Sequence, residues 1–170
     1  HPERTFLFFK GRVALHAILQ AAGINEGDEV VVPGFTCVVV PAAVCYTGAT
    51  PRFYDIDPRT LNGDPERAAA LITKRTKAVI LQHNFGYPCD PGCLVDMCRE
   101  RGILLLEDCA HAVGAAWSGM PVGTIGDASF CSLQWSKPAT TGLGGIALIN
   151  TPELIEPIKA VVDTYSEPST

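Results

Sequence analysis

Residues 77–108 read KAVILQHNFGYPCDPGCLVDMCRERGILLLED, with two apolar runs on either side of a helix-like segment. The runs at 77–83 and 103–108 have the length and continuous apolar character of strands buried on both faces. Residues 90–102 read as a helix that ends at Gly102, a residue suited to the end of a helix. Two such strands joined by a helix predict a parallel pair.

The same alternation continues in both directions along the chain. Further strands are predicted at 28–34, 51–57, 129–135 and 144–150. Helices are predicted at 12–23, after Pro41, at 64–72 with Asp64 as N-cap, and at 152–165. Residues 111–134 are rich in glycine and lack a long helical pattern. We therefore predict an α/β fold, a three-layer α/β/α arrangement with a mostly parallel central sheet, in which residues 1–170 form a single domain.

The charge and the apolar runs exclude several classes of partner. The 170 residues carry a formal net charge of −5, so no basic field exists to hold nucleic acid or an anionic membrane. No apolar run reaches transmembrane length. The sequence begins without methionine or a signal-peptide cleavage pattern, and we expect it to be processed or cut from a longer chain.

Seven cysteines are scattered through apolar segments, a pattern that favours reduced thiols in a cytoplasmic protein over a disulfide framework. Cys89, Cys93 and Cys98 lie close together in the sequence. Their spacing matches no paired zinc-ligand motif, and no histidine follows nearby. We predict no metal site.

Lys137 follows the predicted strand 129–135 and precedes a glycine-rich turn. A lysine at a strand end can lay its stem along apolar surface and keep its ammonium group in water. Alternatively, a desolvated lysine has a lowered pKa and can form an imine with a carbonyl group. The position alone does not choose between the two.

Other polar residues occur where ligands of α/β sheets bind, beyond the carboxyl ends of the strands. Asp108 ends a buried strand, where it could also cap a turn, and His111 follows three residues later. Gly11 and Arg12 begin the first helix, whose N-terminus is suited to bind an anion, although such an arginine is often only solvated. Together with a hydroxyl from Ser132, these groups describe a pyridoxal phosphate site.

Residues 5–155 resemble the large domain of the DegT/DnrJ/EryC1/StrS aminotransferases, which are sugar aminotransferases among the fold-type-I pyridoxal phosphate enzymes. The resemblance rests on motifs in the family's order and spacing, namely GDEVVVPGFT, AVCYTGATPRFYDIDPRTLN, ITKRTKAVILQHNFGYPCD, EDCAHAVGA, VGTIGDASFCSLQWSK and GLGG.

The resemblance implies a role for each candidate residue. Lys137 would hold the cofactor as a Schiff base, and Asp108 would keep the pyridine nitrogen protonated. His111 takes the place of a residue that approaches the 3-oxygen of the ring. Ser132 would bind the phosphate with Gly11, Arg12 and the backbone of Val13, and Cys37 stands where an aromatic residue commonly stacks on the ring.

The chain departs from the family pattern at three positions. Arg12 replaces a threonine, and its guanidinium can contact phosphate with a different reach. Cys37 replaces the stacking aromatic residue, and Leu143 replaces an acidic one. A sister group of dehydratases carries histidine at the lysine position, so Lys137 argues against that chemistry.

The resemblance implies a cytoplasmic homodimer that transfers an amino group from glutamate to a keto sugar of a nucleotide-sugar. The family is more than twice as long and adds a small C-terminal domain, so we expect the 170-residue chain to be an incomplete enzyme. The alternatives are a non-catalytic remnant of the fold, and an enzyme of the same family with another substrate.

Overall fold

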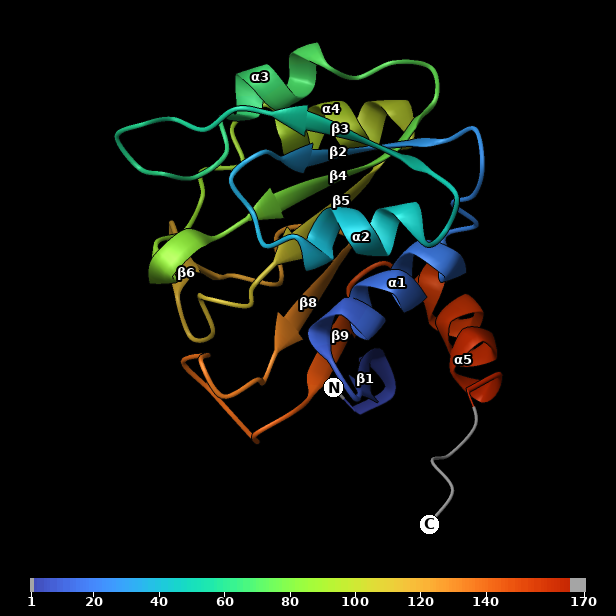
Figure 1. Ribbon diagram of the computed structural model, residues 1–170. Coiled ribbons are helices and arrows are strands. Elements are labelled where there is room, and N and C mark those ends of the chain that lie inside the picture. The colour runs from blue at the N-terminus through green and yellow to red at the C-terminus, as the bar shows by residue number, and fades with distance from the viewer. Residues whose placement is uncertain (1, 166–170) are drawn as a thin grey trace.

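The computed structural model describes residues 2–165, which form a central sheet of seven strands with helices on both faces (Figure 1). The strand order is β1-β9-β8-β5-β4-β2-β3. The strands are Thr5–Phe8 (β1), Glu29–Pro33 (β2), Thr50–Tyr54 (β3), Thr76–Gln82 (β4), Leu104–Asp108 (β5), Ala128–Ser132 (β8) and Gly145–Ile149 (β9). Strands β3, β2, β4, β5 and β8 are parallel neighbours, and β9 pairs antiparallel with β8 and β1. The predicted α/β fold with a mostly parallel sheet is confirmed.

Two layers of helices cover the sheet (Figure 1). Helices α1 (Gly11–Ala21), α2 (Val39–Cys45) and α5 (Ile155–Asp163) pack on one face, and α3 (Pro65–Ala70) and α4 (Leu94–Arg101) on the other. Because successive side chains of a strand point to opposite faces, β2 contributes to both cores. Val30 and Val32 pack with the first layer, whereas Val31 packs with the second.

The ends of two helices follow the predicted sequence signals. The Asp64 side chain accepts hydrogen bonds from the backbone N–H groups of Glu66 at 2.9 Å and Arg67 at 3.3 Å, with Pro65 in the first helical position. Gly102 ends α4 with φ +64°, in the left-handed region that favours glycine.

Many element ends differ from the prediction by one to four residues, and two of these differences lie next to the cavity described below. Helix α2 begins at Val39, so Pro41 is its third residue; this is tolerated because N–H groups of the first turn have no partner within the helix. The strand predicted to reach Trp135 ends at Ser132. Beyond it the chain turns, and the N–H of Lys137 donates to the carbonyl of Gln134 at 2.9 Å.

Several short elements had no clear signal in the sequence. The edge strand β1 buries only Phe8, so its pattern is weak. Strands β6 (Ala116–Trp117) and β7 (Met120–Pro121) form a hairpin within the glycine-rich segment, and short 3-10 helices occupy Pro2–Arg4, Asn84–Gly86 and Pro152–Leu154. Among residues 2–165, no helix combines the length and apolar character needed to cross a membrane.

Candidate active site

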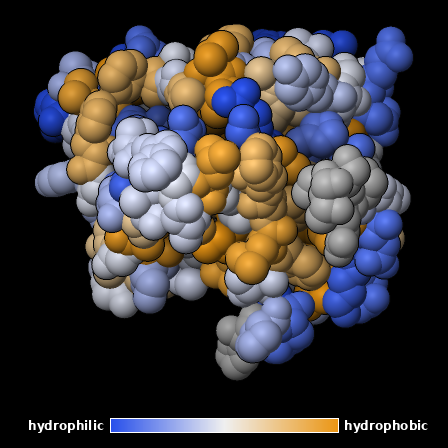
Figure 2. Space-filling view, turned by 60° about the horizontal axis from the view of Figure 1, so that its bottom comes forward, coloured by the Kyte–Doolittle hydropathy of each residue, from blue (hydrophilic) through white to orange (hydrophobic). Residues whose placement is uncertain are grey.

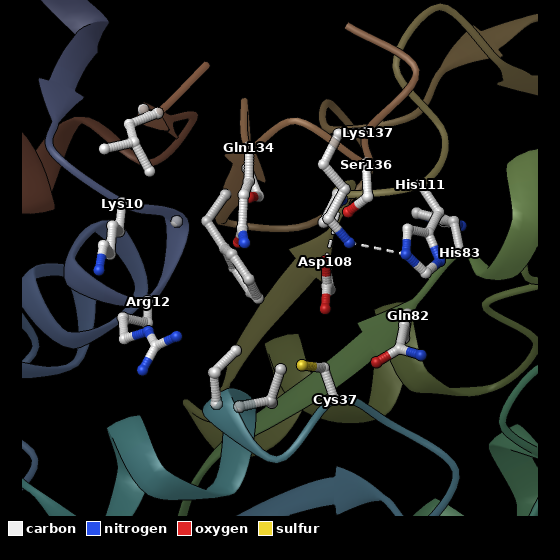
Figure 3. Close-up of a pocket in the computed structure, with 18 residues that line it drawn as sticks. Lys10, Arg12, Cys37, Gln82, His83, Asp108, His111, Gln134, Ser136 and Lys137 are labelled. Carbon is white, nitrogen blue, oxygen red and sulfur yellow. Dashed lines mark hydrogen bonds between the residues drawn. The ribbon is translucent and has the colours of Figure 1, made fainter. Parts of the chain in front are cut away.

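A cavity of about 310 Å³ lies beyond the carboxyl ends of β4, β5 and β8, against the start of α1 (Figure 3). Seven of the eight predicted site residues line it: Gly11, Arg12, Cys37, Asp108, His111, Ser132 and Lys137. They come from four separate segments of the chain, 11–12, 37, 108–111 and 132–137. The cavity lies within the size range of small-molecule sites, roughly 300–1,000 Å³.

Lys137 is carried by a loop whose base is closed by hydrogen bonds. The N–H of Leu133 donates to the carbonyl of Gly144 at 2.9 Å, and the hydroxyl of Thr140 donates to the carbonyl of Leu133 at 2.9 Å. The Lys137 side chain is half-buried, and its Nζ lies 2.7 Å from Nε2 of His111. It therefore points into the cavity rather than serving as a solvated strand end (Figure 3).

The contact with Lys137 determines which nitrogen of His111 carries the proton. An ammonium group can only donate, so Nε2 of His111 accepts and the proton of the neutral imidazole is on Nδ1. Burial lowers the pKa of His111, and the positive charge of Lys137 lowers it further. His111 is accordingly an uncharged acceptor at neutral pH.

Asp108 lies on the floor of the same cavity. One carboxylate oxygen accepts the N–H of Ala110 at 2.9 Å, so the residue does cap the following turn, the alternative that its position also allowed. Burial raises the pKa of Asp108 to about 6, although the Ala110 N–H and the charge of Lys137 oppose the shift. A buried carboxyl group with a raised pKa is suited to pair with a cation delivered by a ligand.

The start of α1 approaches β8 closely at Gly11. A β-carbon at this position would lie 3.0 Å from both the Cys131 carbonyl oxygen and the Ser132 β-carbon, so any other residue would force β8 or α1 to shift by a few tenths of an ångström. Arg12 is exposed and lies at the cavity edge with Lys10, on the side away from His111 (Figure 3).

Val13 is the predicted residue that lies outside the cavity. Its backbone N–H donates to the carbonyl of Lys10 at 3.0 Å, and its side chain packs against the core beneath α1. The helix start therefore offers the cavity Gly11 and Arg12 rather than Val13.

Cys37 is exposed and lines the cavity, across from Lys137 in Figure 3. The loop that carries it is held by Gln82 at the end of β4. The Gln82 side chain accepts from the Thr36 hydroxyl and donates to the Phe35 carbonyl at 3.2 Å and to the Asn84 side-chain oxygen. Sequence reasoning missed Gln82, although a polar residue ending an apolar strand was a usable signal.

His83, Glu107 and Cys109 form the one group of potential metal ligands in the described part of the chain. Nδ1 of His83 accepts the N–H of Cys89 at 2.9 Å, so its Nε2 donates to Glu107 at 3.0 Å. The Glu107 carboxylate also accepts three backbone N–H groups, from Gly123, Ile125 and Gly126. Because these lone pairs are already used, the cluster is a buried structural network.

The residues around the cavity fit pyridoxal phosphate in their chemistry. A lysine amine, a buried carboxyl group that lacks a cation, and a helix start next to a serine hydroxyl surround one space. These are the groups that bind its aldehyde, its pyridine nitrogen and its phosphate.

Known aminotransferases resemble this chain along most of its length. Residues 8–165 match the family model described as the DegT/DnrJ/EryC1/StrS aminotransferase family. The chain is 42% identical over 156 residues to GDP-perosamine synthase of Escherichia coli O157:H7, and 43% identical over 135 residues to L-glutamine:scyllo-inosose aminotransferase of Streptomyces griseus. These matches cover 92% and 79% of the chain, but only 43% and 32% of the two relatives.

The solved structure of the aminotransferase TlmJ from Streptoalloteichus hindustanus superposes with a TM-score of 0.87 at 37% identity. That match covers 92% of this chain and 43% of TlmJ, so the chain spans less than half of the proteins it resembles. The family model, by contrast, matches nearly the whole chain. The chain belongs to the DegT/DnrJ/EryC1/StrS aminotransferase family.

Proposed function

We propose that the protein to which this chain belongs is a pyridoxal phosphate-dependent aminotransferase acting on a keto sugar of a nucleotide-sugar. One observation carries the proposal: Lys137, Asp108 and the start of α1 line a single cavity. These groups are far apart in sequence, and an aminotransferase needs them together.

Each residue has a defined task in this proposal. Gly11, Arg12 and Ser132 bind the phosphate, and Cys37 covers one face of the ring. Asp108 places a negative charge at the pyridine nitrogen, which keeps that nitrogen protonated. Lys137 would hold the cofactor through its amine, and the same amine could move a proton at the reacting carbon of the substrate. Bound pyridoxal phosphate supplies the conjugated ring that accepts the electron pair of that carbon.

The relatives' names support the acceptor class and leave two amino donors to compare. GDP-perosamine synthase is named for a nucleotide-linked amino sugar, which supports a nucleotide-sugar acceptor. Glutamate is the donor that we propose with this acceptor. The Streptomyces griseus relative is named for L-glutamine and scyllo-inosose, which favours glutamine and a free cyclic ketone as the second candidate.

We also propose that the protein works as a homodimer. Figure 2 shows apolar surface gathered in the middle of the face at the bottom of Figure 1. Four large apolar side chains are among those exposed on the molecule: Leu7, Phe9, Trp135 and Leu143. Surfaces of this kind commonly mark interfaces between proteins. Sedimentation equilibrium of the chain checks the proposal, and a monomer across the micromolar range contradicts it.

The cofactor assignment is tested by trapping. The chain is mixed with pyridoxal phosphate, its absorbance is recorded, and the linkage is reduced with borohydride before peptide mapping. We expect the label on Lys137, loss of the label in Lys137→Ala, and an unchanged label in Lys77→Ala, which removes an exposed lysine. A label on Lys74, Lys77 or Lys159 contradicts the assignment.

The donor is tested on the loaded protein by adding glutamate or glutamine and following the absorbance of the cofactor. A spectral change with one donor identifies it. Because we expect the 170-residue chain to be an incomplete enzyme, a lack of response to both donors supports the non-catalytic alternative only when the full-length protein is tested.

A further inference from the structure

Phe85 has a backbone conformation that its residue type disfavours. Its φ is +53° and its ψ is 27°, in the left-handed region where a bulky side chain is an outlier. Such strain persists only where the surroundings impose it, and it concentrates at functional sites.

Hydrogen bonds on either side of Phe85 impose this conformation. The N–H of Asn84 donates to the Asn62 side chain and the Asn84 amide donates to the Leu61 carbonyl, both at 2.8 Å. The N–H of Tyr87 then donates to the Asn84 carbonyl at 2.8 Å. Glycine would adopt the same turn without strain, so a property of the phenylalanine side chain has to explain why phenylalanine occupies this position.

Burial does not account for it, because Phe85 is 68% exposed. What its ring does contact is His111: the two rings stack with centroids 5.8 Å apart and planes inclined by 23°. A second ring, that of Phe35, lies 6.2 Å from Phe85. At the edge of the His111 ring, Nε2 lies 2.7 Å from Nζ of Lys137 (Figure 3).

We propose that Phe85 is a positioning residue that holds the His111 ring so that Nε2 accepts the proton of the Lys137 ammonium group. Lys137 must lose that proton before its amine can react with a carbonyl group, and His111 is the acceptor already in contact with it. The inference deepens the proposed function, since it describes how the amine of the same site is prepared.

The effect of the Phe85 ring on the pKa of His111 can be distinguished from the effects of the ionisable groups nearby. The charged neighbour in contact with His111 is Lys137, and burial of the ring is the larger cause of its lowered pKa. The remaining ionisable groups that line the cavity are Lys10, Arg12, Cys37, His83 and Asp108. The variants below leave all of them in place, so a change in His111 reports on the stacking ring.

The test uses the chain without cofactor and follows its histidine ring nitrogens by ¹⁵N NMR from pH 4 to 9. The His111 signals are assigned by their loss in His111→Gln. In the parent and in Phe85→Tyr we expect the neutral His111 ring to be in the Nδ1–H form, with a pKa below its ordinary value. In Phe85→Ala and Phe85→Gly we expect mixed tautomers and a pKa that moves up toward the ordinary value, because the ring becomes hydrated.

Tyr46→Ala is the matched control, since Tyr46 is a similarly exposed ring that contacts His16 at 6.4 Å in another part of the molecule. It should leave His111 unchanged. If Phe85→Ala leaves the tautomer and pKa of His111 as in the parent, or if Tyr46→Ala changes them equally, the positioning role is wrong.

A second measurement connects the geometry to Lys137. The rate of borohydride-trapped labelling of Lys137 by pyridoxal phosphate at pH 7 should fall about tenfold in Phe85→Ala, and little in Phe85→Tyr. An unchanged rate in Phe85→Ala contradicts the inference. Failure of the parent to bind pyridoxal phosphate contradicts the proposed function instead, and leaves the NMR result as an independent test of the ring contact.

Discussion

Glu107 and Asp108 are consecutive residues at the end of β5, and their carboxyl groups have pKa values shifted in opposite directions. Burial raises the pKa of both. At Glu107 the hydrogen bonds from His83, Gly126 and Gly123 outweigh burial and lower it. At Asp108 a single backbone N–H and more distant charges do not outweigh burial, so the pKa of Asp108 is raised to about 6.

Alternation along the strand explains the contrast, because neighbouring side chains point to opposite faces. Glu107 points into a polar network that is complete without a ligand, whereas Asp108 points into the cavity. Two neighbouring carboxyl groups whose pKa values are shifted in opposite directions are typical of sites in which the two groups have different tasks.

Asp108→Asn should stabilise the cofactor-free chain. A folded-state pKa near 6 exceeds the ordinary value of 3.8, so ionisation of Asp108 opposes folding as pH rises from about 4 to about 6. The two-unit shift corresponds to about 3 kcal/mol at pH 7, which the amide avoids. Urea unfolding at pH 4 and pH 7 measures this effect. The free energy of unfolding of the variant should exceed that of the parent at pH 7 and differ little from it at pH 4. An equal effect at both pH values contradicts the assignment.

Glu107→Gln should destabilise the chain by about 3 kcal/mol in urea unfolding at pH 7, because an amide cannot accept all four donors that face Glu107. The pKa of Glu107 is lower in the folded chain than in the unfolded chain. The stabilisation by its carboxylate is therefore fully present above the unfolded pKa near 4.5, and it is lost as pH falls through the folded pKa. Glu100→Gln, an exposed position on α4, should change stability by less than about 0.5 kcal/mol. Similar losses in the two variants would show that the network contributes little.

Cys37 should be protected from iodoacetamide by pyridoxal phosphate. Cys37, Cys45 and Cys93 are exposed, but of these three only Cys37 lines the cavity. We expect alkylation of all three in the free chain, and selective loss of Cys37 labelling once the cofactor is bound. Mass spectrometry of the peptides provides the readout, with Cys45 and Cys93 as internal controls. Equal labelling of Cys37 with and without cofactor places the ring elsewhere.

Arg12→Ala should weaken pyridoxal phosphate binding about ten- to a hundredfold, as expected for loss of a charge-assisted contact with phosphate. Arg99→Ala removes an exposed arginine on α4, outside the cavity, and should leave affinity unchanged. Fluorescence titration measures both. A change of less than about twofold in Arg12→Ala would assign phosphate binding to the helix start and Ser132 alone.

The sequence predicted the parallel strands and the helices between them because these elements depend on local patterns. Apolar runs such as 103–108 allow few structures other than buried strands, and Asp64 and Gly102 mark helix ends through their own backbone preferences. The edge strand β1 was missed because one buried residue gives no periodic signal. The family motifs, in turn, predicted seven of the residues that line the cavity.

Only the tertiary structure decided how those residues meet. The contact of Lys137 with His111 spans 26 positions in the sequence, and the link from Gln82 to Thr36 spans 46. The opposite pKa shifts of Glu107 and Asp108, and the stacking of the Phe85 and His111 rings, likewise have no local signal. Local patterns fix the conformation of each segment, whereas burial and hydrogen bonding depend on which distant segments the sheet brings side by side.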